Sequence, residues 1–169
     1  NVLFLGTFTG SFDFSAVFGA ADVLGRKNVP VKFIFCGNGA KEIEIKKKCS
    51  ARENCIFAGW VDTEKIQAIL ELSDVGLAPY IDSQNFIKNV PNKLPEYMSG
   101  GLVVASNLSQ GEIPLLLSKG GCGFVYSGDP SILAEKLANL HCNRARLNSM
   151  KKASLEVFFA NYQSSKIYG

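Results

Sequence analysis

The residues with the clearest chemical potential lie in one stretch, Asn89 to Ala105, which reads NVPNKLPEYMSGGLVVA. Pro95 suits the first turn of a helix, and Gly100-Gly101 then ends that helix before a buried strand. Glu96 is therefore expected near the amino end of a short helix. A carboxylate in that position can complement the helix dipole, or it can accept two hydrogen bonds from a diol such as a ribose.

The same helix end is suited to an anion. Its first backbone N–H groups have no partner within the helix, and they can bind a diphosphate. Lys93 adds a point charge beside them. The alternative reading of Lys93 is an ordinary lysine in solvent.

Two glycine-containing loops follow the first two apolar runs of the chain. The first loop, GTFTGS from Gly6 to Ser11, lacks the spacing of a dinucleotide fingerprint and the lysine of a P-loop. Small residues between a strand and a helix nevertheless allow backbone N–H groups to approach an anion. The second loop, Gly37-Asn38-Gly39, allows positive φ and a close approach by a flat ligand. Ordinary turns use the same residues, so both readings stay open.

The elements that must position these residues alternate between strand and helix. Short apolar runs bounded by glycine or proline predict six strands. They are Val2–Leu5, Val31–Cys36, a short strand at Ile56 and Phe57, Val75–Ala78, Leu102–Ala105 and Gly123–Tyr126. Runs this apolar are typical of strands covered on both faces. Such strands belong to a parallel sheet between helical layers.

The segments between the runs carry helical periodicity and start signals. Phe14, Val17, Phe18, Ala21 and Leu24 recur at helical spacing, with Asp13 as the expected cap and Gly25 as the expected stop. Asp62 is expected to cap a second helix. Asp129-Pro130 is expected to start a third helix, whose Leu133, Leu137 and Leu140 face inward. The sequence therefore predicts an α/β, doubly wound, Rossmann-like parallel sheet of about six strands with helices on both faces.

Ligands of such sheets bind where the strands end. The loops at those ends are expected at Gly6–Phe12, Gly37–Ala40, Gly59–Asp62, Pro79–Pro95 and Ser106–Gly111. They contain much of the Gly, Asn, Ser and Thr in the chain. Any functional site is expected to be assembled from them.

Composition narrows the class of protein. The chain has 169 residues, 47% hydrophobic and 20% charged, which suits one globular domain with a sizeable core. A net charge of +3 is too small to favour nucleic acid as a partner. The basic run Lys46-Lys47-Lys48 is read as a solvated helix face, and His141, the single histidine, as a surface residue. The cysteines form no C-x-x-C pair, and their odd number favours free thiols in a reducing cytoplasm.

Several segments, in the same order, resemble the family-four retaining glycosyltransferases, also called group 1. EYMSGGLVV from Glu96 resembles the family's E-A-M-A-x-G-x-P-V-V segment, and NKLPEY resembles a subgroup motif of cell-envelope and capsular polysaccharide synthesis. The other matching segments are VKFIFCGNG from Val31, NCIFAGWV from Asn54, SDVGLAPY from Ser73, GCGFV from Gly121 and GDP from Gly128. The likeness runs from Val2 to about Phe159.

The resemblance implies one half of a GT-B fold, in which two Rossmann-like domains face each other across a cleft. Residues 1–169 correspond to the C-terminal domain, which holds the nucleotide diphosphate sugar. The acceptor-binding N-terminal domain would be absent, and the fragment alone would be inactive. The resemblance and the loops together indicate these donor-binding residues: Gly6, Thr7, Gly10, Ser11, Gly37, Asn38, Gly39, Trp60, Val61, Lys88, Asn92, Lys93 and Glu96.

The resemblance also implies partners and setting. No catalytic residue is assigned, and the family needs no metal or other cofactor. The expected partners are a nucleotide-sugar donor, the missing domain and a glycan or lipid-linked acceptor. The expected location is the cytoplasm, with peripheral attachment at the inner membrane face through the missing domain.

Two departures from the family pattern leave alternatives open. The first acid of the family's E-x7-E motif would fall at position 88, where this chain has Lys88. The basic pair that the family often places after the first strand is replaced by Thr7 and the region around Asp13 and Phe14. A module that binds nucleotide sugar, or a partner, without turnover would fit Lys88 in place of the acid. A GT-B nucleotide-sugar epimerase is a third reading, which keeps the fold and changes the reaction, although the E-x7-E-like region and NKLPEY argue against it.

The last aromatic residues of the chain suggest an interface. Leu155, Val157, Phe158, Phe159 and Tyr162 follow the last strand, where little core is expected to remain. In GT-B enzymes the C-terminal helices cross back to the N-terminal domain. Part of this surface is therefore expected to be exposed in the isolated domain.

Overall fold

The computed structural model describes residues 1–162 and contains one six-stranded parallel sheet. The strand order is β3-β2-β1-β4-β5-β6. The chain builds the sheet outward from β1 to β3, then crosses to the other side of β1 and continues from β4 to β6. The strands are β1 (Val2–Leu5), β2 (Phe33–Cys36), β3 (Cys55–Gly59), β4 (Val75–Ala78), β5 (Val103–Ser106) and β6 (Gly123–Val125). Strands β1, β4 and β5 are buried along their whole length, which explains their unbroken apolar sequences.

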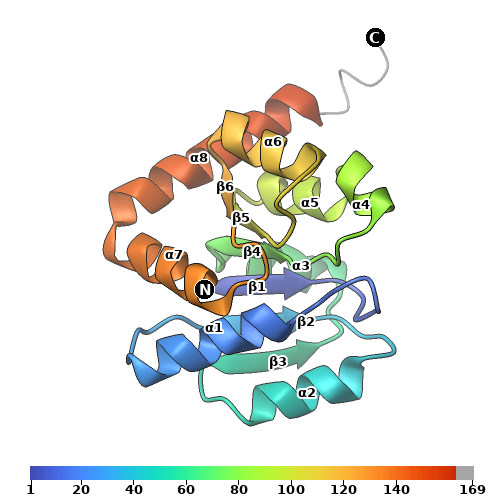
Figure 1. The fold of residues 1–169 in the computed structure, drawn as a ribbon, viewed down its shortest axis with the longest axis vertical. Coiled ribbons are helices and arrows are strands. Elements are labelled where there is room, and N and C mark those ends of the chain that lie inside the picture. Colours follow the sequence, from blue (N-terminus) through green and yellow to red (C-terminus); the bar gives the residue numbers. More distant parts are fainter. Residues whose placement is uncertain (163–169) are drawn as a thin grey trace.

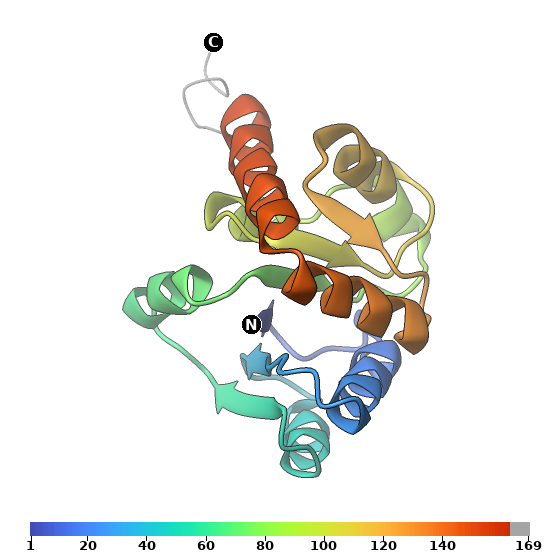
Figure 2. The ribbon, with the colours of Figure 1, turned by 90° about the vertical axis from the view of Figure 1, so that its left-hand side faces the viewer.

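Helices cover both faces of this sheet, as the sequence predicts. Helices α1 (Ser15–Arg26) and α7 (Pro130–Cys142) pack against each other in front of the sheet in Figure 1, and α3 (Thr63–Glu71) and α5 (Lys93–Ser99) lie behind it. Figure 2 shows these layers on opposite sides of the strands. The remaining helices are α2 (Glu42–Ser50), α4 (Gln84–Lys88), α6 (Glu112–Gly120) and α8 (Arg144–Asn161).

Several helix boundaries follow the expected capping chemistry. The Asp62 side chain accepts a hydrogen bond from the Lys65 N–H and caps α3, and Asp129 caps α7 with Pro130 in the first turn. Leu133, Leu137 and Leu140 are buried as expected. Helix α1 differs in two respects. Asp13 accepts from the Ser15 N–H but lies one residue before the N-cap, and the helix continues through Gly25 to Arg26.

The structure corrects two further expectations. Strand β2 begins at Phe33 rather than Val31, since Val31 precedes the first ladder pair, Val2 with Phe33. The segment Pro79–Pro95, expected as a loop, contains the short helix α4 and the first turn of α5. Helix α4 buries none of its residues, so no apolar stripe marked it in the sequence.

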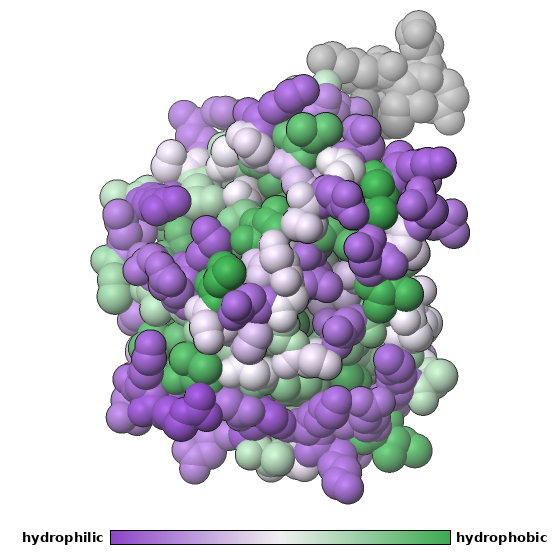
Figure 3. All heavy atoms as spheres, in the orientation of Figure 1, coloured by the Kyte–Doolittle hydropathy of each residue, from purple (hydrophilic) through white to green (hydrophobic). Residues whose placement is uncertain are grey.

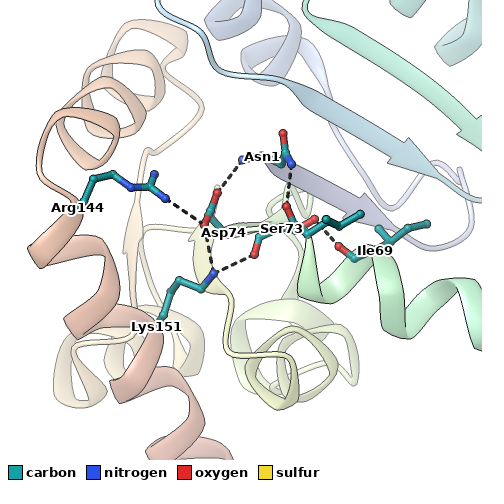
Figure 4. A network of polar contacts seen from close by, with 7 residues as sticks. Asn1, Ile69, Ser73, Asp74, Arg144 and Lys151 are labelled. Carbon is teal, nitrogen blue, oxygen red and sulfur yellow. Dashed lines mark hydrogen bonds and ion pairs between the residues drawn. The ribbon is translucent and has the colours of Figure 1, made fainter.

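Helix α8 is fixed to this domain at the amino ends of the strands (Figure 4). Asp74, just before β4, accepts from Lys151 Nζ at 3.1 Å and lies 3.8 Å from Arg144, while Lys151 also donates to the Ser73 carbonyl. Farther along α8, the buried Ser154 hydroxyl donates to the Leu102 carbonyl at 2.6 Å. The helix therefore belongs to the fold of this domain.

The apolar end of α8 is partly covered and partly open. Leu155, Val157, Phe158 and Tyr162 are half-buried, and Leu155 and Val157 contact the backbone near Gly101 and Gly120. Phe159 remains 50% exposed. More core is available to this segment than the sequence suggested, because β5 and α6 lie beneath it. The part of the expectation that concerns residues 163–169 lies outside the described residues.

The surface is that of a folded domain with mixed polarity. On the face with α1 and α7, hydrophilic side chains dominate the lower part and hydrophobic ones appear as separate spots (Figure 3).

Cys36, Cys49, Cys55 and Cys122 are buried free thiols, whereas Cys142 and His141 are exposed. Among residues 1–162, no helix has both the length and the hydrophobicity needed to cross a membrane.

Candidate functional site

The loops after β1, β2 and β3 meet at the carboxyl ends of the strands, on the right-hand side of Figure 1. Backbone hydrogen bonds connect them: Gly6 N–H donates to the Cys36 carbonyl, Phe8 N–H to Asn38, and Gly37 N–H to Gly59, at 2.7–3.0 Å. These bonds hold the three loops in one fixed arrangement.

Glycine is required where the second loop passes the first. A Cβ on Gly37 would lie 1.8 Å from the Gly6 carbonyl oxygen, and one on Gly39 would lie 2.8 Å from the Phe8 carbonyl oxygen. Both glycines also have φ in the left-handed range, +145° and +136°. The space of the missing side chains is thus filled by the neighbouring loop, which is a structural reason for both glycines.

An open pocket of about 330 Å³ lies beside these loops. Helix α5 forms one wall through Lys93 and Glu96. The opposite wall is formed by Trp60, Val61 and Ile66 at the start of α3. The remaining lining residues are Leu5, Gly6, Thr7, Gly37 and Asn38. The pocket brings together eight of the thirteen residues that the sequence indicated.

Glu96 carries an unpaired carboxylate at this pocket. Its backbone N–H donates to the Asn92 carbonyl inside α5, and its side chain is half-exposed. Within residues 1–162 the carboxylate has neither a hydrogen bond nor an ion pair. It can therefore accept hydrogen bonds from a ligand without breaking a contact in the protein.

Lys93 differs from the solvated lysine that was one reading of the sequence. Its ammonium donates to the Leu5 carbonyl at the end of β1 and lies 4.4 Å from the centre of the Phe4 ring. The rings of Phe12 and Tyr97 are also close, at 5.3 and 5.7 Å. Burial lowers the pKa of Lys93 to about 8, although the nearby Glu96 favours the charged form.

Tyr97 explains how α5 reaches this position. Its hydroxyl accepts from the Leu5 N–H at 3.0 Å and donates to the Leu77 carbonyl at 3.1 Å. Strands β1 and β4 pair only through Val2–Val75 and Leu3–Gly76, so the Tyr97 hydroxyl bridges the two strands where their ladder ends. Lys93 and Tyr97 are one helical turn apart and bind the two backbone groups of Leu5. The NKLPEY motif thus anchors the helix and leaves Glu96 at the pocket.

The close approach of this tyrosine depends on a glycine in the neighbouring strand. A Cβ on Gly76 would lie 2.4 Å from the Tyr97 ring. Sequence reasoning missed Leu5, Ile66, Tyr97 and Gly76, which have apolar or small side chains typical of a core. A glycine inside an apolar strand was the one available signal for the close contact.

Five of the indicated residues do not line the pocket. Lys88 is exposed on α4, Asn92 is exposed at the start of α5, and Gly10, Ser11 and Gly39 lie in the loops. In the first loop, the backbone N–H groups of Thr7, Thr9 and Gly10 have no partner among the described residues. That these groups bind an anion, as the sequence suggested for this loop, stays a prediction.

Metal ligands do not gather in the part of the chain that the structure describes. Residues 1–162 contain no group of three His, Cys, Asp or Glu side chains arranged to hold a metal ion. The side chains at the pocket that carry charge are one carboxylate and one ammonium, which suit recognition of hydroxyl and phosphate groups.

The strand order and the pocket at the strand ends define a Rossmann-like α/β domain. Residues 1–143 match the model of a family described as glycosyl transferases group 1. The chain belongs to this family. The resemblance found in the sequence segments is thereby confirmed.

Solved structures share the fold. The C-terminal domain of the group 1 glycosyl transferase LpcC from Francisella tularensis is similar with a TM-score of 0.72 and 15% identity, over 96% of this chain and 86% of that domain. The catalytic domain of cholesterol-α-glucosyltransferase from Helicobacter pylori gives a TM-score of 0.74 and 16% identity, over 96% and 98%. HepE from Anabaena, in complex with UDP-glucose, gives 0.74 and 15%, over 98% of this chain and 45% of HepE.

Some of these similar proteins are much longer than this chain, which matches only part of their length. It spans 33% of the Staphylococcus aureus TarM chain and 45% of HepE. No curated protein sequence gives a significant match. At 15–16% identity these structures establish the fold and not the ligand.

Proposed function

We propose that this chain is the donor-binding domain of a retaining glycosyltransferase, with a nucleoside diphosphate sugar in the pocket between α5 and the loops after β1, β2 and β3. The observation that carries this proposal is the presence, at one pocket, of a free carboxylate and of an ammonium without an ion-pair partner. The Glu96 carboxylate has no partner in the described residues, and the Lys93 ammonium has no ion-pair partner there. A ligand with both a diol and a diphosphate complements the two groups.

Different lining residues suit different parts of the ligand. Glu96 accepts hydrogen bonds from the ribose hydroxyls, and Lys93 with the unpaired N–H groups of the first loop holds the diphosphate. Trp60 is 69% exposed at the rim and, with Val61 and Ile66, offers apolar surface to the base. Gly6, Thr7, Gly37 and Asn38 form the backbone between these parts.

The comparisons supply the first ligands to test. HepE is described in complex with UDP-glucose and with UDP, and TarM is described with UDP. Uridine diphosphate and its sugars are therefore the first candidates for this pocket. The proposed reaction transfers the sugar without a metal, and the pocket's cation stabilises charge on the departing diphosphate.

The acceptor and the second domain are also proposals. LpcC is described as a group 1 glycosyl transferase, and WaaG as a glycosyltransferase of lipopolysaccharide biosynthesis. We infer a role in polysaccharide or cell-envelope glycan synthesis, at the cytoplasmic side. The glycan or lipid-linked acceptor would bind to an N-terminal domain that this chain does not contain.

Calorimetric titration of the 169-residue chain tests the donor site. UDP, GDP, ADP and CDP, each also as its glucose conjugate, would be titrated up to millimolar concentration. We expect one nucleotide to bind, and Glu96→Gln to weaken it while the exposed Glu135→Gln on α7 leaves it unchanged. No binding heat with any of these compounds would contradict the donor site.

One observation favours a second candidate, a module that binds nucleotide sugar without turnover. Lys88 stands where the family motif has its first acid, and it is exposed on α4, outside the lining of the pocket. Turnover decides between the two. Release of UDP from UDP-sugar by the full-length protein with a glycan acceptor supports the transferase, and binding without release supports the module.

A further inference from the structure

We propose that Lys93 is the counter-ion of the donor's diphosphate, and that binding of the donor draws a proton onto its amine. The inference rests on the proposed donor site at the same pocket, and it adds a proton to the binding equilibrium. It predicts that affinity for the donor falls as the pH rises above about 8.

The surroundings of Lys93 are unusual for a cation. The ammonium lies over the Phe4 ring, with Phe12 and Tyr97 nearby, and it fills the space that a Cβ on Gly6 would need. One of its three N–H groups donates to the Leu5 carbonyl. In residues 1–162 it has no carboxylate at ion-pair distance, although Glu96 lies on the same helix. Lys65 and Lys88, near the same loops, are exposed.

Rings and a carbonyl stabilise an ammonium less than water does, so burial favours the neutral amine. This is why burial brings the pKa of Lys93 down to about 8. A diphosphate in the adjoining pocket places negative charge beside the amine, and an opposite charge within a few ångströms raises the pKa of a lysine again. Binding and protonation of Lys93 must therefore favour each other.

The neighbouring titratable groups do not compete in this pH range. Burial raises the pKa of Tyr97 and Tyr80, and raises that of Cys36 to about 11, so all three keep their protons near pH 8. Asp13, between the first loop and α1, has a lowered pKa because Ser15 donates to it. Glu96 on α5, which lines the same pocket, is the remaining facing group.

The size of the effect follows from the free-state pKa. At pH 8.0 half of the free protein carries a neutral Lys93, so saturation with donor should take up about 0.5 proton per site if the bound pKa exceeds about 10. At pH 7.0 the uptake should fall to about 0.1 proton. Above pH 8 the dissociation constant should approach a tenfold rise per pH unit.

Calorimetry in paired buffers measures this proton directly. UDP-glucose would be titrated into the 169-residue chain in HEPES and in Tris, whose ionisation enthalpies differ and which contain no phosphate to compete for the site, at pH 7.0 and 8.0. UDP-glucose is preferred to UDP because its diphosphate has no terminal group that titrates in this range. The difference between the two observed enthalpies, divided by the difference between the two buffers' ionisation enthalpies, gives the number of protons taken up.

Two variants separate Lys93 from other sources of protons. Lys93→Met should abolish the uptake at pH 8.0 and weaken binding at pH 7.0 by tenfold or more, whereas Lys119→Met, an exposed lysine on α6, should change neither. Thermal melting establishes whether Lys93→Met still folds. If it does not, Lys93→Arg replaces it, because a guanidinium stays protonated at both pH values and should likewise abolish the uptake.

Each outcome has a definite meaning. Uptake near half a proton at pH 8.0 that disappears in Lys93→Met supports the proposal. Binding without uptake at pH 8.0 overturns it and leaves the donor site standing. Uptake that persists unchanged in a folded Lys93→Met assigns the proton to another group and also overturns it. Absence of any binding overturns the donor site and this inference together.

Discussion

The hydroxyl of Tyr97 offers a stringent test of how the site is held in place. It bridges the Leu5 N–H of β1 and the Leu77 carbonyl of β4, at 3.0 and 3.1 Å, where the two strands no longer pair. Tyr97 is fully buried, so water cannot replace the lost hydroxyl. Tyr97→Phe removes one oxygen and leaves two buried backbone groups without partners.

The expected cost follows from those two groups. A buried donor or acceptor left unsatisfied costs about 1–3 kcal/mol, and the two together should lower the free energy of unfolding by about 2–6 kcal/mol. For a domain of this size each kcal/mol corresponds to about 2–4 °C in melting temperature. Urea denaturation followed by circular dichroism, with an unchanged m-value, measures the loss.

The protein contains a matched control for this substitution. Tyr126 is equally buried, but its hydroxyl has no hydrogen-bond partner among the described residues. Tyr126→Phe makes the same chemical change without orphaning a backbone group. It should leave the free energy of unfolding unchanged, or raise it by up to about 1 kcal/mol. Equal losses in the two variants would refute the bridging role of Tyr97.

Three further predictions concern the pocket, the loops and the last helix. Glu96→Gln should weaken nucleotide binding about tenfold or more by calorimetry with an unchanged melting curve, because a charged hydrogen bond is worth about 1.5–3 kcal/mol. Unchanged affinity would mean that Glu96 only complements the dipole of α5 and does not contact the nucleotide. Gly37→Ala should lower the free energy of unfolding, measured by urea denaturation, by about 3 kcal/mol or more, because its Cβ would lie 1.8 Å from the Gly6 carbonyl oxygen. A loss under about 1 kcal/mol would show that the loops can move apart at little cost. Hydrogen exchange should show weaker protection of residues 155–162 in this chain than in the full-length protein, since Phe159 is half-exposed; equal protection would mean that α8 packs only on its own domain.

The layout of the sheet could be anticipated because strands buried on both faces have continuous apolar sequences. Val2–Leu5 and Val75–Ala78 coincide with β1 and β4 for this reason. Asp62 and Asp129 were recognisable as caps, because capping chemistry is local. Helix α4 was missed because it buries no residue and so leaves no periodic apolar signal.

The site residues were only partly predictable. Glu96 and Trp60 could be placed at the strand ends because strand-to-helix loops of a parallel sheet share one edge. The glycines at 37 and 39 were read as room for a ligand, whereas the structure also fills their side-chain space with the first loop. A sequence shows that a position needs glycine but not which neighbour occupies the space.

The sequence by itself determined the alternation of strands and helices and the edge of the sheet at which polar residues gather, because these depend on local composition and periodicity. The family followed separately, from the resemblance of several ordered segments. Only the tertiary structure decided the roles of Lys93 and Tyr97. Both contact Leu5, about ninety residues earlier in the chain, through its carbonyl and its N–H. Whether a lysine is solvated or buried depends on what the fold packs around it, and here that is the end of a strand and a cluster of rings.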